Sequence, residues 1–157
     1  MGFLLNAFTD FSILMGNEFI FFIVVGAMVM LAERRSEKRQ KILLAVIIAS
    51  LAVIGLRHLF AVERPCMDEY APYGCPDGPL SAYSFPSGHA TIAFLVMIAF
   101  LDKPSFPFFW LFALLIAASR VFLGVHSFED IAGAMVLAPI VYFATDALWR
   151  RYFEGNK

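Results

Sequence analysis

The sequence predicts an all-α integral membrane protein: a helical bundle of about five transmembrane helices, preceded by a short N-terminal interfacial helix. Of its 157 residues, 61% are hydrophobic and only 16% are charged, whereas soluble domains are about half apolar and about one-quarter charged. The apolar residues form five segments, and most positive charges lie between or after them. The length suits a single domain over residues 1–157.

The five apolar segments are expected to be helices. Residues 42–49, for example, are apolar on every side, which is typical of a helix that is buried or faces lipid. Several segments are shorter than the ~20 residues of a full span. Polar catalytic residues at the helix ends would explain this, because charge inside a bundle is tolerated where it is paired or hydrated. The segments are about 18–32, 42–62, 87–101, 106–125 and 131–149.

The first seventeen residues have the pattern of an amphipathic helix. Four apolar side chains recur at helical spacing, with polar side chains between them; they are Leu4, Phe8, Phe11 and Met15. A short helix of this kind lies in the membrane interface. A cleaved signal peptide is the weaker interpretation, because the segment has no basic start and no small-residue cleavage site.

Positive charges predict the orientation of the chain. Apart from three arginines in the motifs below, lysine and arginine occur only in residues 33–41, at Lys103 and in residues 150–157. Short basic loops stay in the cytoplasm, so these places are expected inside, together with the C-terminus. Residues 63–86, rich in Pro, Gly, Tyr and Asp, then form an extracytoplasmic loop. We expect a multi-pass protein of the cell (inner or plasma) membrane.

Both cysteines, Cys66 and Cys75, lie in this predicted outer loop. On an oxidising face they could close a disulfide; two free thiols are the alternative. Two cysteines cannot supply the four ligands of a structural zinc site.

Polar and backbone-shaping residues gather at the predicted outer ends of the helices, where ionisable groups are costly and are candidates for function. These residues are Arg57, Arg64, Pro65, Ser87, Gly88, His89, Ser119, Arg120, His126 and Asp130. Guanidinium groups match phosphate oxygens in pairs. Residues 86–89 also open a helix, where free N–H groups favour an anion. Together these features predict a phosphate site on the extracytoplasmic face.

His126 and Asp130 stand four residues apart around a sequence that resembles a capping box. A carboxylate beside an imidazole fixes its tautomer and stabilises its cation, which suits a nucleophilic histidine. His89 then remains to protonate the leaving oxygen. Each motif alone has an ordinary structural interpretation, such as a helix cap or stop, but their joint occurrence on one membrane face favours catalysis.

These three blocks resemble the signature of the type 2 phosphatidic acid phosphatase (PAP2) superfamily, which also includes vanadium haloperoxidases. The family pattern is Lys-x6-Arg-Pro, then Pro-Ser-Gly-His, then Ser-Arg-x5-His-x3-Asp. The chain matches it in order and spacing, except that Arg57 stands where the family usually has lysine. The resemblance covers about residues 42–149, the expected catalytic core. Membrane members usually have six spans, one more than the five expected here.

The resemblance implies a role for each matching residue. His126 would attack phosphorus and form a phosphohistidine, Asp130 would orient it, and His89 would serve as acid and then as base. The residues that would hold the phosphate are Arg57, Arg64, Ser87, Gly88, Ser119 and Arg120. The family needs no metal or cofactor, and the chain has no carboxylate cluster suited to Mg²⁺.

The expected activity is that of a metal-independent lipid phosphatase acting on a phosphate or pyrophosphate monoester. The resemblance suggests polyprenyl pyrophosphate, phosphatidylglycerol phosphate, phosphatidic acid or lipid A 1-phosphate, with a slight preference for the first because the chain has little beyond a minimal core. Partners are this substrate and membrane lipids; net charge −1 and the lack of a nucleic-acid module argue against nucleic acid. The alternatives are a non-catalytic protein that binds or moves lipid phosphates and a vanadate-dependent oxidase, although the apolar spans argue against the oxidase.

Overall fold

The computed structural model describes residues 2–67, 75 and 83–154. Within this part of the chain the secondary structure is helical, with one isolated bridge between Glu63 and Tyr83. The all-α prediction is confirmed. The helices are α1 (Gly2–Leu14), α2 (Glu18–Ala32), α3 (Ser36–Phe60), α4 (Gly88–Ala99), α5 (Phe106–Phe122) and α6 (Phe128–Trp149), with a 3-10 turn over Pro65–Met67 and a π-helical turn over Arg150–Glu154.

The start of α3 differs from the prediction. The sequence suggested a basic loop up to residue 41, but the helix already begins at Ser36. Its first turns consist of long charged side chains, which have good helix propensity, and Glu37 in the first turn suits the positive end of the helix dipole. The charged segment therefore extends the apolar helix instead of ending it.

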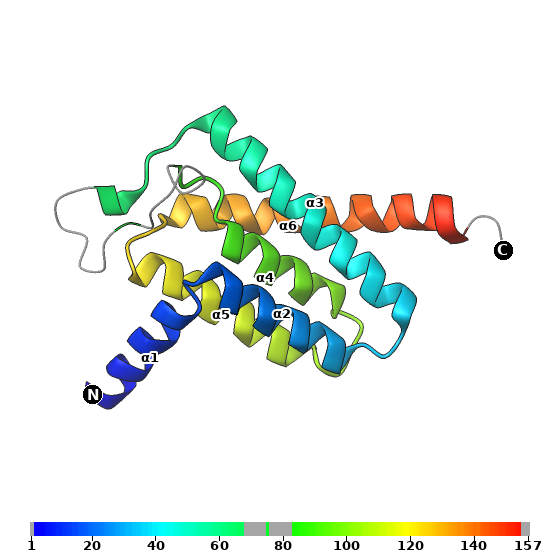
Figure 1. The fold of residues 1–157 in the computed structure, drawn as a ribbon, viewed down its shortest axis with the longest axis horizontal. Helices are drawn as coiled ribbons and strands as arrows, with labels where there is room; N and C mark the ends of the chain where they lie inside the picture. Colours follow the sequence, from blue (N-terminus) through cyan, green and yellow to red (C-terminus); the bar gives the residue numbers. More distant parts are fainter. Residues whose placement is uncertain (1, 68–74, 76–82, 155–157) are drawn as a thin grey trace.

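Helix α4 lies at the centre of the bundle, in contact with α2, α3, α5 and α6 (Figure 1). Its residues 90–96 are buried without interruption. A helix with neighbours on every side has no polar face, which explains its apolar sequence. At its end, the Phe100 ring stacks on Phe109 of α5 with centroids 4.1 Å apart.

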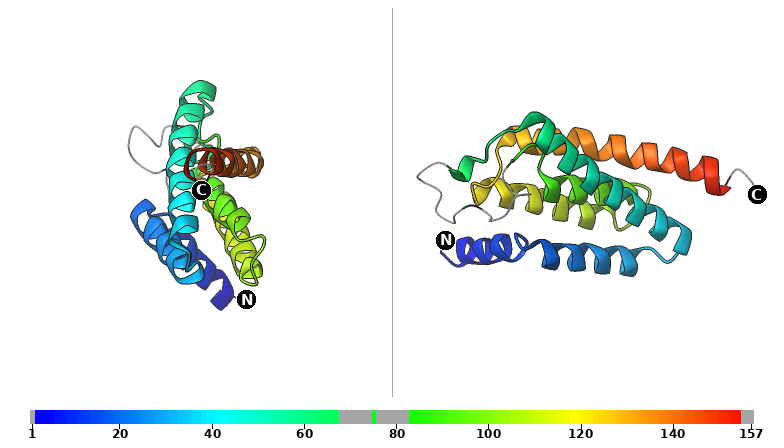
Figure 2. Two further views of the ribbon diagram at one scale, coloured as in Figure 1. Left: turned by 90° about the vertical axis from the view of Figure 1, so that its right-hand side faces the viewer. Right: turned by 45° about the horizontal axis from the view of Figure 1, so that its top comes forward.

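Within the described part of the chain, two helices are each long and apolar enough to cross a membrane: α3, and α6 with its continuation to Phe153. The consecutive helices α1 and α2 meet at 95° and, taken as one bent span, would be a third. The twelve residues of α4 extend only about 18 Å, less than the ~30 Å hydrocarbon core. The predicted five spans therefore remain a prediction. Figure 2 shows α6 projecting beyond α4 and α5.

Helix α1 turns away from α2 and packs on α5, where the Phe8 ring meets Phe122 edge to face at 5.1 Å (Figure 1). Its outer surface is apolar, with Phe3 and Leu4 exposed by 83% and 75%. A short helix with exposed large apolar side chains suits the membrane interface.

Charged residues join the helices at the end of the bundle opposite to Arg57. Asp146 of α6 is paired with Lys41 of α3 and, at 2.6 Å, with Arg150. Glu33, only 2% exposed, accepts a hydrogen bond from the Arg35 N–H at 3.0 Å.

The Glu33 carboxylate also attracts two ammonium groups, those of Lys103 at 3.4 Å and Lys38 at 3.8 Å. Burial raises the pKa of Glu33, but the hydrogen bond from Arg35 and the charges of both lysines lower it more, so the pKa lies below its ordinary value. The ionised carboxylate therefore stabilises the connection between α2 and α3.

Glu33→Gln is expected to lower the free energy of unfolding by about 1 to 2 kcal/mol at neutral pH, because the buried cluster loses its negative charge. Since folding lowers the pKa of Glu33, its contribution is complete above about pH 4.3 and declines as the pH falls through the folded pKa. Unfolding in detergent should therefore separate Glu33→Gln from wild type at pH 7 and less so in acid. The exposed Glu37, changed to Gln, serves as the control; equal effects of the two changes would contradict the assignment.

Candidate active site

The start of α6 holds the predicted histidine and aspartate side by side. His126 Nδ1 lies 3.1 Å from Asp130 Oδ2, and the two residues are 3% and 1% exposed. The predicted capping box is confirmed: Asp130 Oδ2 accepts a hydrogen bond from the Ser127 N–H at 2.9 Å, and Ser127 Oγ accepts one from the Asp130 N–H at 3.3 Å. One helix cap thus fixes the carboxylate and, through it, the imidazole.

Ser84 also supports Asp130, although it lies outside the three motif blocks. Its hydroxyl is 3.1 Å from Asp130 Oδ1. Its N–H donates to the Val62 carbonyl at 2.8 Å, beside the bridge of the neighbouring residues. A lone serine after a turn carries no sequence signal for such a contact. The Ser84 hydroxyl gives the buried Asp130 carboxylate a further hydrogen-bond donor, which stabilises a charge that is removed from water.

The start of α4 presents two buried polar atoms that have no hydrogen-bond partner among the described residues: Ser87 Oγ and His89 Nε2. Ser87 is the N-cap of α4, but its side chain does not cap the helix; its N–H donates instead to the Asp130 carbonyl at 3.2 Å. The His89 ring packs on Phe21 of α2 with centroids 4.5 Å apart. Because buried polar atoms are nearly always paired with protein or water, these two atoms can bind water or a polar ligand.

Two of the predicted arginines are held by backbone carbonyls. Arg57, in the last turn of α3, donates through Nε to the Pro86 carbonyl at 3.3 Å. Arg64 is buried and donates through Nη1 to the Val125 carbonyl at 3.2 Å. These contacts link both guanidinium groups to the segments that carry Ser87 and His126. The carboxylates of Glu18 and Asp130 lie near enough to attract both guanidinium groups.

Arg120 is held by a neighbour and by the N-terminal helix. Its Nε donates to Ser119 Oγ at 3.0 Å, and its Nη2 donates to the Ser12 carbonyl at 2.7 Å. Both Arg120 and Ser12 are buried. A Cβ on Gly16 would lie 3.0 Å from the Ile13 carbonyl, 3.3 Å from the Ser12 carbonyl and 3.4 Å from Arg120 Nη1. The end of α1 is therefore part of the wall of the site.

The predicted polar residues form one cluster. Arg57, Arg64, Arg120 and His126 all lie near enough to His89 to act on it electrostatically. A Cβ on Gly88 would lie 3.5 Å from Arg57 Nη2. The two histidines thus share one end of the bundle, with positive charge around them. Such a cup suits a phosphate group.

No group of three or more His, Cys, Asp or Glu side chains is arranged to hold a metal ion within the described residues.

A small cavity of about 160 Å³ adjoins this cluster between α2, α3 and α4. Its polar end is formed by Glu18, Arg57 and His89. Its other walls are mainly apolar and include Val53 and Ile54 of α3. Glu18 was not among the predicted site residues, because at the start of an apolar helix it has the pattern of an ordinary N-terminal acid.

The segment before Ser87 is packed directly against α6. The ring of Phe85 touches Gly133, and a Cβ at that position would overlap the ring. Glycine is required here by a close approach and not by an unusual backbone angle.

A disulfide joins Cys66 and Cys75, whose Cα atoms are 5.3 Å apart. Cys66 packs in a small buried cluster with Leu123 and Val125. The rest of the predicted outer loop, residues 68–74 and 76–82, lies outside the described residues.

Among curated proteins, the chain is 29% identical over 117 residues to the YbjG protein of Escherichia coli (strain K12), whose assignment as an undecaprenyl-diphosphatase is provisional. The match includes 70% of this chain but only 56% of that protein, so the chain spans little more than half the length of this relative.

Two solved structures share the fold. The crystal structure of Aquifex aeolicus LpxE matches with a TM-score of 0.71 and 25% identity, over 90% of this chain and 85% of that one. A transmembrane PAP2 type phosphatidylglycerolphosphate phosphatase from Bacillus subtilis matches with a TM-score of 0.67 and 20% identity, over 97% and 79%. The expected membrane bundle is thus the fold of known membrane phosphatases. The sequence model of the PAP2 superfamily matches residues 38–153, and the chain belongs to this superfamily.

Proposed function

We propose that this protein is a metal-independent lipid phosphatase that hydrolyses a phosphate or pyrophosphate monoester through a phosphohistidine. The observation that carries the proposal is the buried His126–Asp130 pair, which lies with His89 among three arginines. The pairing of Nδ1 with a carboxylate leaves His126 Nε2 as the nucleophile. Membership of a superfamily with phosphatase members supports the same chemistry.

In the first step, His126 Nε2 attacks the terminal phosphorus and the bond from phosphorus to the leaving oxygen breaks. The imidazole becomes positively charged as the N–P bond forms, and Asp130 stabilises that charge. Protonated His89 gives its proton to the leaving oxygen. The arginines stabilise the charge on the three peripheral phosphoryl oxygens; they are Arg57, Arg64 and Arg120.

In the second step, a water molecule attacks the phosphorus of the phosphohistidine while His89 accepts its proton. The N–P bond breaks, inorganic phosphate is released, and the two histidines return to their starting states. Ser87, Gly88 and Ser119 are proposed to complete the phosphate site. The buried Ser87 hydroxyl, with no hydrogen-bond partner among the described residues, suits this role because it is available to a phosphate oxygen.

The substrate is proposed to be a lipid that reaches the site sideways from the bilayer. The apolar walls of the cavity at Val53 and Ile54 support this, since they continue from the phosphate site toward the exposed surface of α3. The similarity to YbjG favours polyprenyl pyrophosphate among the four expected lipids. Because the fold also resembles a phosphatidylglycerolphosphate phosphatase and LpxE, the other three expected lipids remain candidate substrates.

The active site is proposed to face the extracytoplasmic side, with the C-terminus in the cytoplasm. The basic segment at the start of α3 and the site at its end lie at opposite ends of one long helix. Because short basic segments stay inside, the opposite end is expected outside.

His126→Ala is expected to abolish phosphate release, by roughly 10³-fold or more, because no nucleophile remains. Purified wild type and variant should be compared in detergent on the four lipid classes, with and without EDTA. His58→Ala is the matched control, since this exposed histidine matches no specified position of the motifs. Equal release by wild type and His126→Ala would disprove the nucleophile. Inactivity of the wild type on all four lipids would favour the non-catalytic lipid-binding alternative, and inhibition by EDTA would disprove metal independence.

Ile54→Trp is expected to obstruct the lateral opening. Loss of contact with about two methylene groups of a lipid chain corresponds to about tenfold in kcat/KM. Activity on a water-soluble phosphate ester should change little, because the phosphate site is untouched. Leu44→Trp, on the same helix but outside the cavity lining, is the control. An equal loss on the lipid and on the soluble ester would argue against entry at this place.

Gly16→Ala is expected to weaken phosphate binding about fivefold, because the added methyl group crowds the carbonyls of Ile13 and Ser12, and the resulting shift at the end of α1 costs about 1 kcal/mol at Arg120. The inhibition constant of inorganic phosphate and the KM for the lipid report this effect separately from kcat. In Gly26→Ala, the control on α2, the new Cβ has no neighbour within 4 Å. Unchanged phosphate affinity in Gly16→Ala would show that α1 does not position Arg120.

A further inference from the structure

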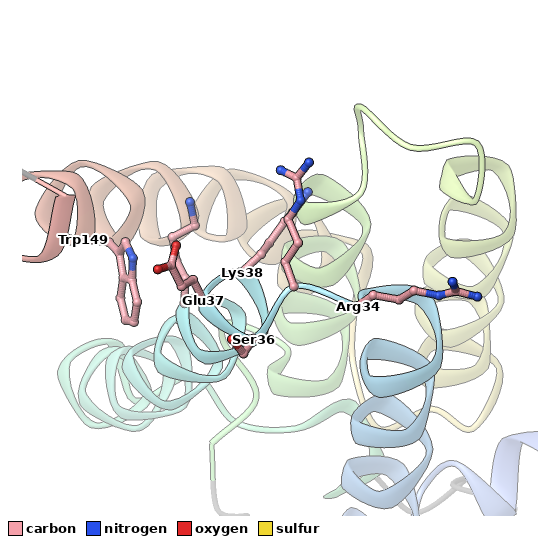
Figure 3. Close-up of a pocket in the computed structure, with 7 residues that line it drawn as sticks. Arg34, Ser36, Glu37, Lys38 and Trp149 are labelled. Carbon is pink, nitrogen blue, oxygen red and sulfur yellow. The ribbon is translucent and has the colours of Figure 1, made fainter. Parts of the chain in front are cut away.

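A second charged cavity lies at the opposite end of the bundle. It has a volume of about 530 Å³ and lies between the first turns of α3 and Trp149 at the end of α6. Helix α3 separates it from Arg57 by about 30 Å, at 1.5 Å per residue. The groove is thus distinct from the proposed catalytic cup. Figure 3 shows Trp149 at one side of it and Arg34 at the other.

Positive charge dominates the lining of this groove. Four cationic side chains border it, against a single carboxylate, that of Glu37. The cations are Arg34, Arg35, Lys38 and Lys41.

The two lysines of the groove are tied to the protein. Lys38 pairs with Asp102 at 3.1 Å, and Lys41 pairs with Asp146. Arg34 and Arg35 are exposed, and neither guanidinium has an ion-pair partner within the described part of the chain. The two arginines therefore carry the charge that is available to an external anion.

The backbone adds to this preference. Helix α3 begins at Ser36, and no side chain caps its first turn. The positive end of a helix dipole with uncapped N–H groups favours an anion. Ser36 itself lines the groove and offers a hydroxyl group.

Exposed apolar residues flank the charged groove. Leu31, one turn before Arg34, is 85% exposed, and Leu148, beside Trp149, is 51% exposed. A tryptophan between charged and apolar surface is typical of the membrane interface. A ligand that matches both surfaces has an anionic head and apolar chains.

We propose that this groove binds the phosphate-bearing head group of an anionic phospholipid, in the leaflet opposite to the catalytic cup. The two arginines contact the phosphate, Trp149 lies at the level of the glycerol, and the acyl chains pack on the exposed leucines. Basic pockets between helices bind anionic head groups by the same physics. The proposal is independent of the catalytic activity, since the groove shares no residue with the catalytic cup.

The test is the retention of phosphatidylglycerol against phosphatidylcholine by purified protein, followed by native mass spectrometry in mixed micelles. Wild type is expected to retain the anionic lipid preferentially. The double change Arg34→Gln with Arg35→Gln should reduce its affinity roughly thirtyfold, from the loss of two charges near the lipid. Arg34→Lys with Arg35→Lys keeps both charges and should retain most of the affinity.

The matched control is Arg39→Gln with Arg151→Gln, which removes the same charge from residues outside the groove and should leave retention unchanged. Equal loss in this control would overturn the site, because it would show a diffuse charge effect. Equal retention of the two lipids by wild type would also overturn it. Displacement of the lipid by soluble glycerol phosphate at similar concentration would overturn the lipid assignment in favour of a soluble phosphate.

Discussion

The buried carboxylate of Asp130 is the constraint around which this end of the bundle is arranged. An ionised group inside an apolar bundle is stable only when its oxygens are hydrogen-bonded. Here the donors come from three separate places: the Ser127 N–H, the hydroxyl of Ser84 and the ring of His126. Satisfying one charge therefore brings the cap of α6, the turn at residue 84 and the imidazole to a common point.

The two ends of the bundle use charge differently. At the end with Glu33 and Asp146, four cations are paired with carboxylates, and these ion pairs link neighbouring segments; the cations are Lys38, Lys41, Lys103 and Arg150. At the end with His126, backbone carbonyls orient the guanidinium groups of Arg57 and Arg64. The cations named here are thus held mainly by carboxylates at one end of the bundle and by backbone carbonyls at the other.

Most of the fold was predictable because a helix that crosses or lies in a bilayer needs a long run of apolar residues, which is visible in the sequence. Five of the helices lie where the apolar segments are, since each must satisfy its own backbone. The predicted start of α3 was wrong. The charged residues after Ser36 are typical of a polar loop, but they also have good helix propensity. The number of spans does not follow from sequence either, since the twelve residues of α4 are too few to indicate whether it crosses the membrane.

The grouping of His89, His126 and Asp130 at one end of the bundle was predictable, because the proposed chemistry requires these particular side chains. It was not predictable where a backbone atom or a lone polar residue acts. The carbonyl of Ser12 holds Arg120, but any residue has a carbonyl, so no pattern marks it. The contact of Ser84 with Asp130 could not be predicted either, because serine is common in turns for reasons unrelated to such a contact.

The contact between Phe85 and Gly133 has a consequence for how the protein tolerates change. The aromatic ring occupies the space that a methyl group at position 133 of α6 would need. The turn that leads to Ser87 therefore packs directly against the backbone of α6. Nearby side chains on α6 such as Val136 and Ile140 are exposed by 62% and 60%, whereas any side chain at position 133 would have to displace the Phe85 ring. A substitution at this position that changes neither charge nor polarity would thereby shift the turn that leads to Ser87 and the start of α4.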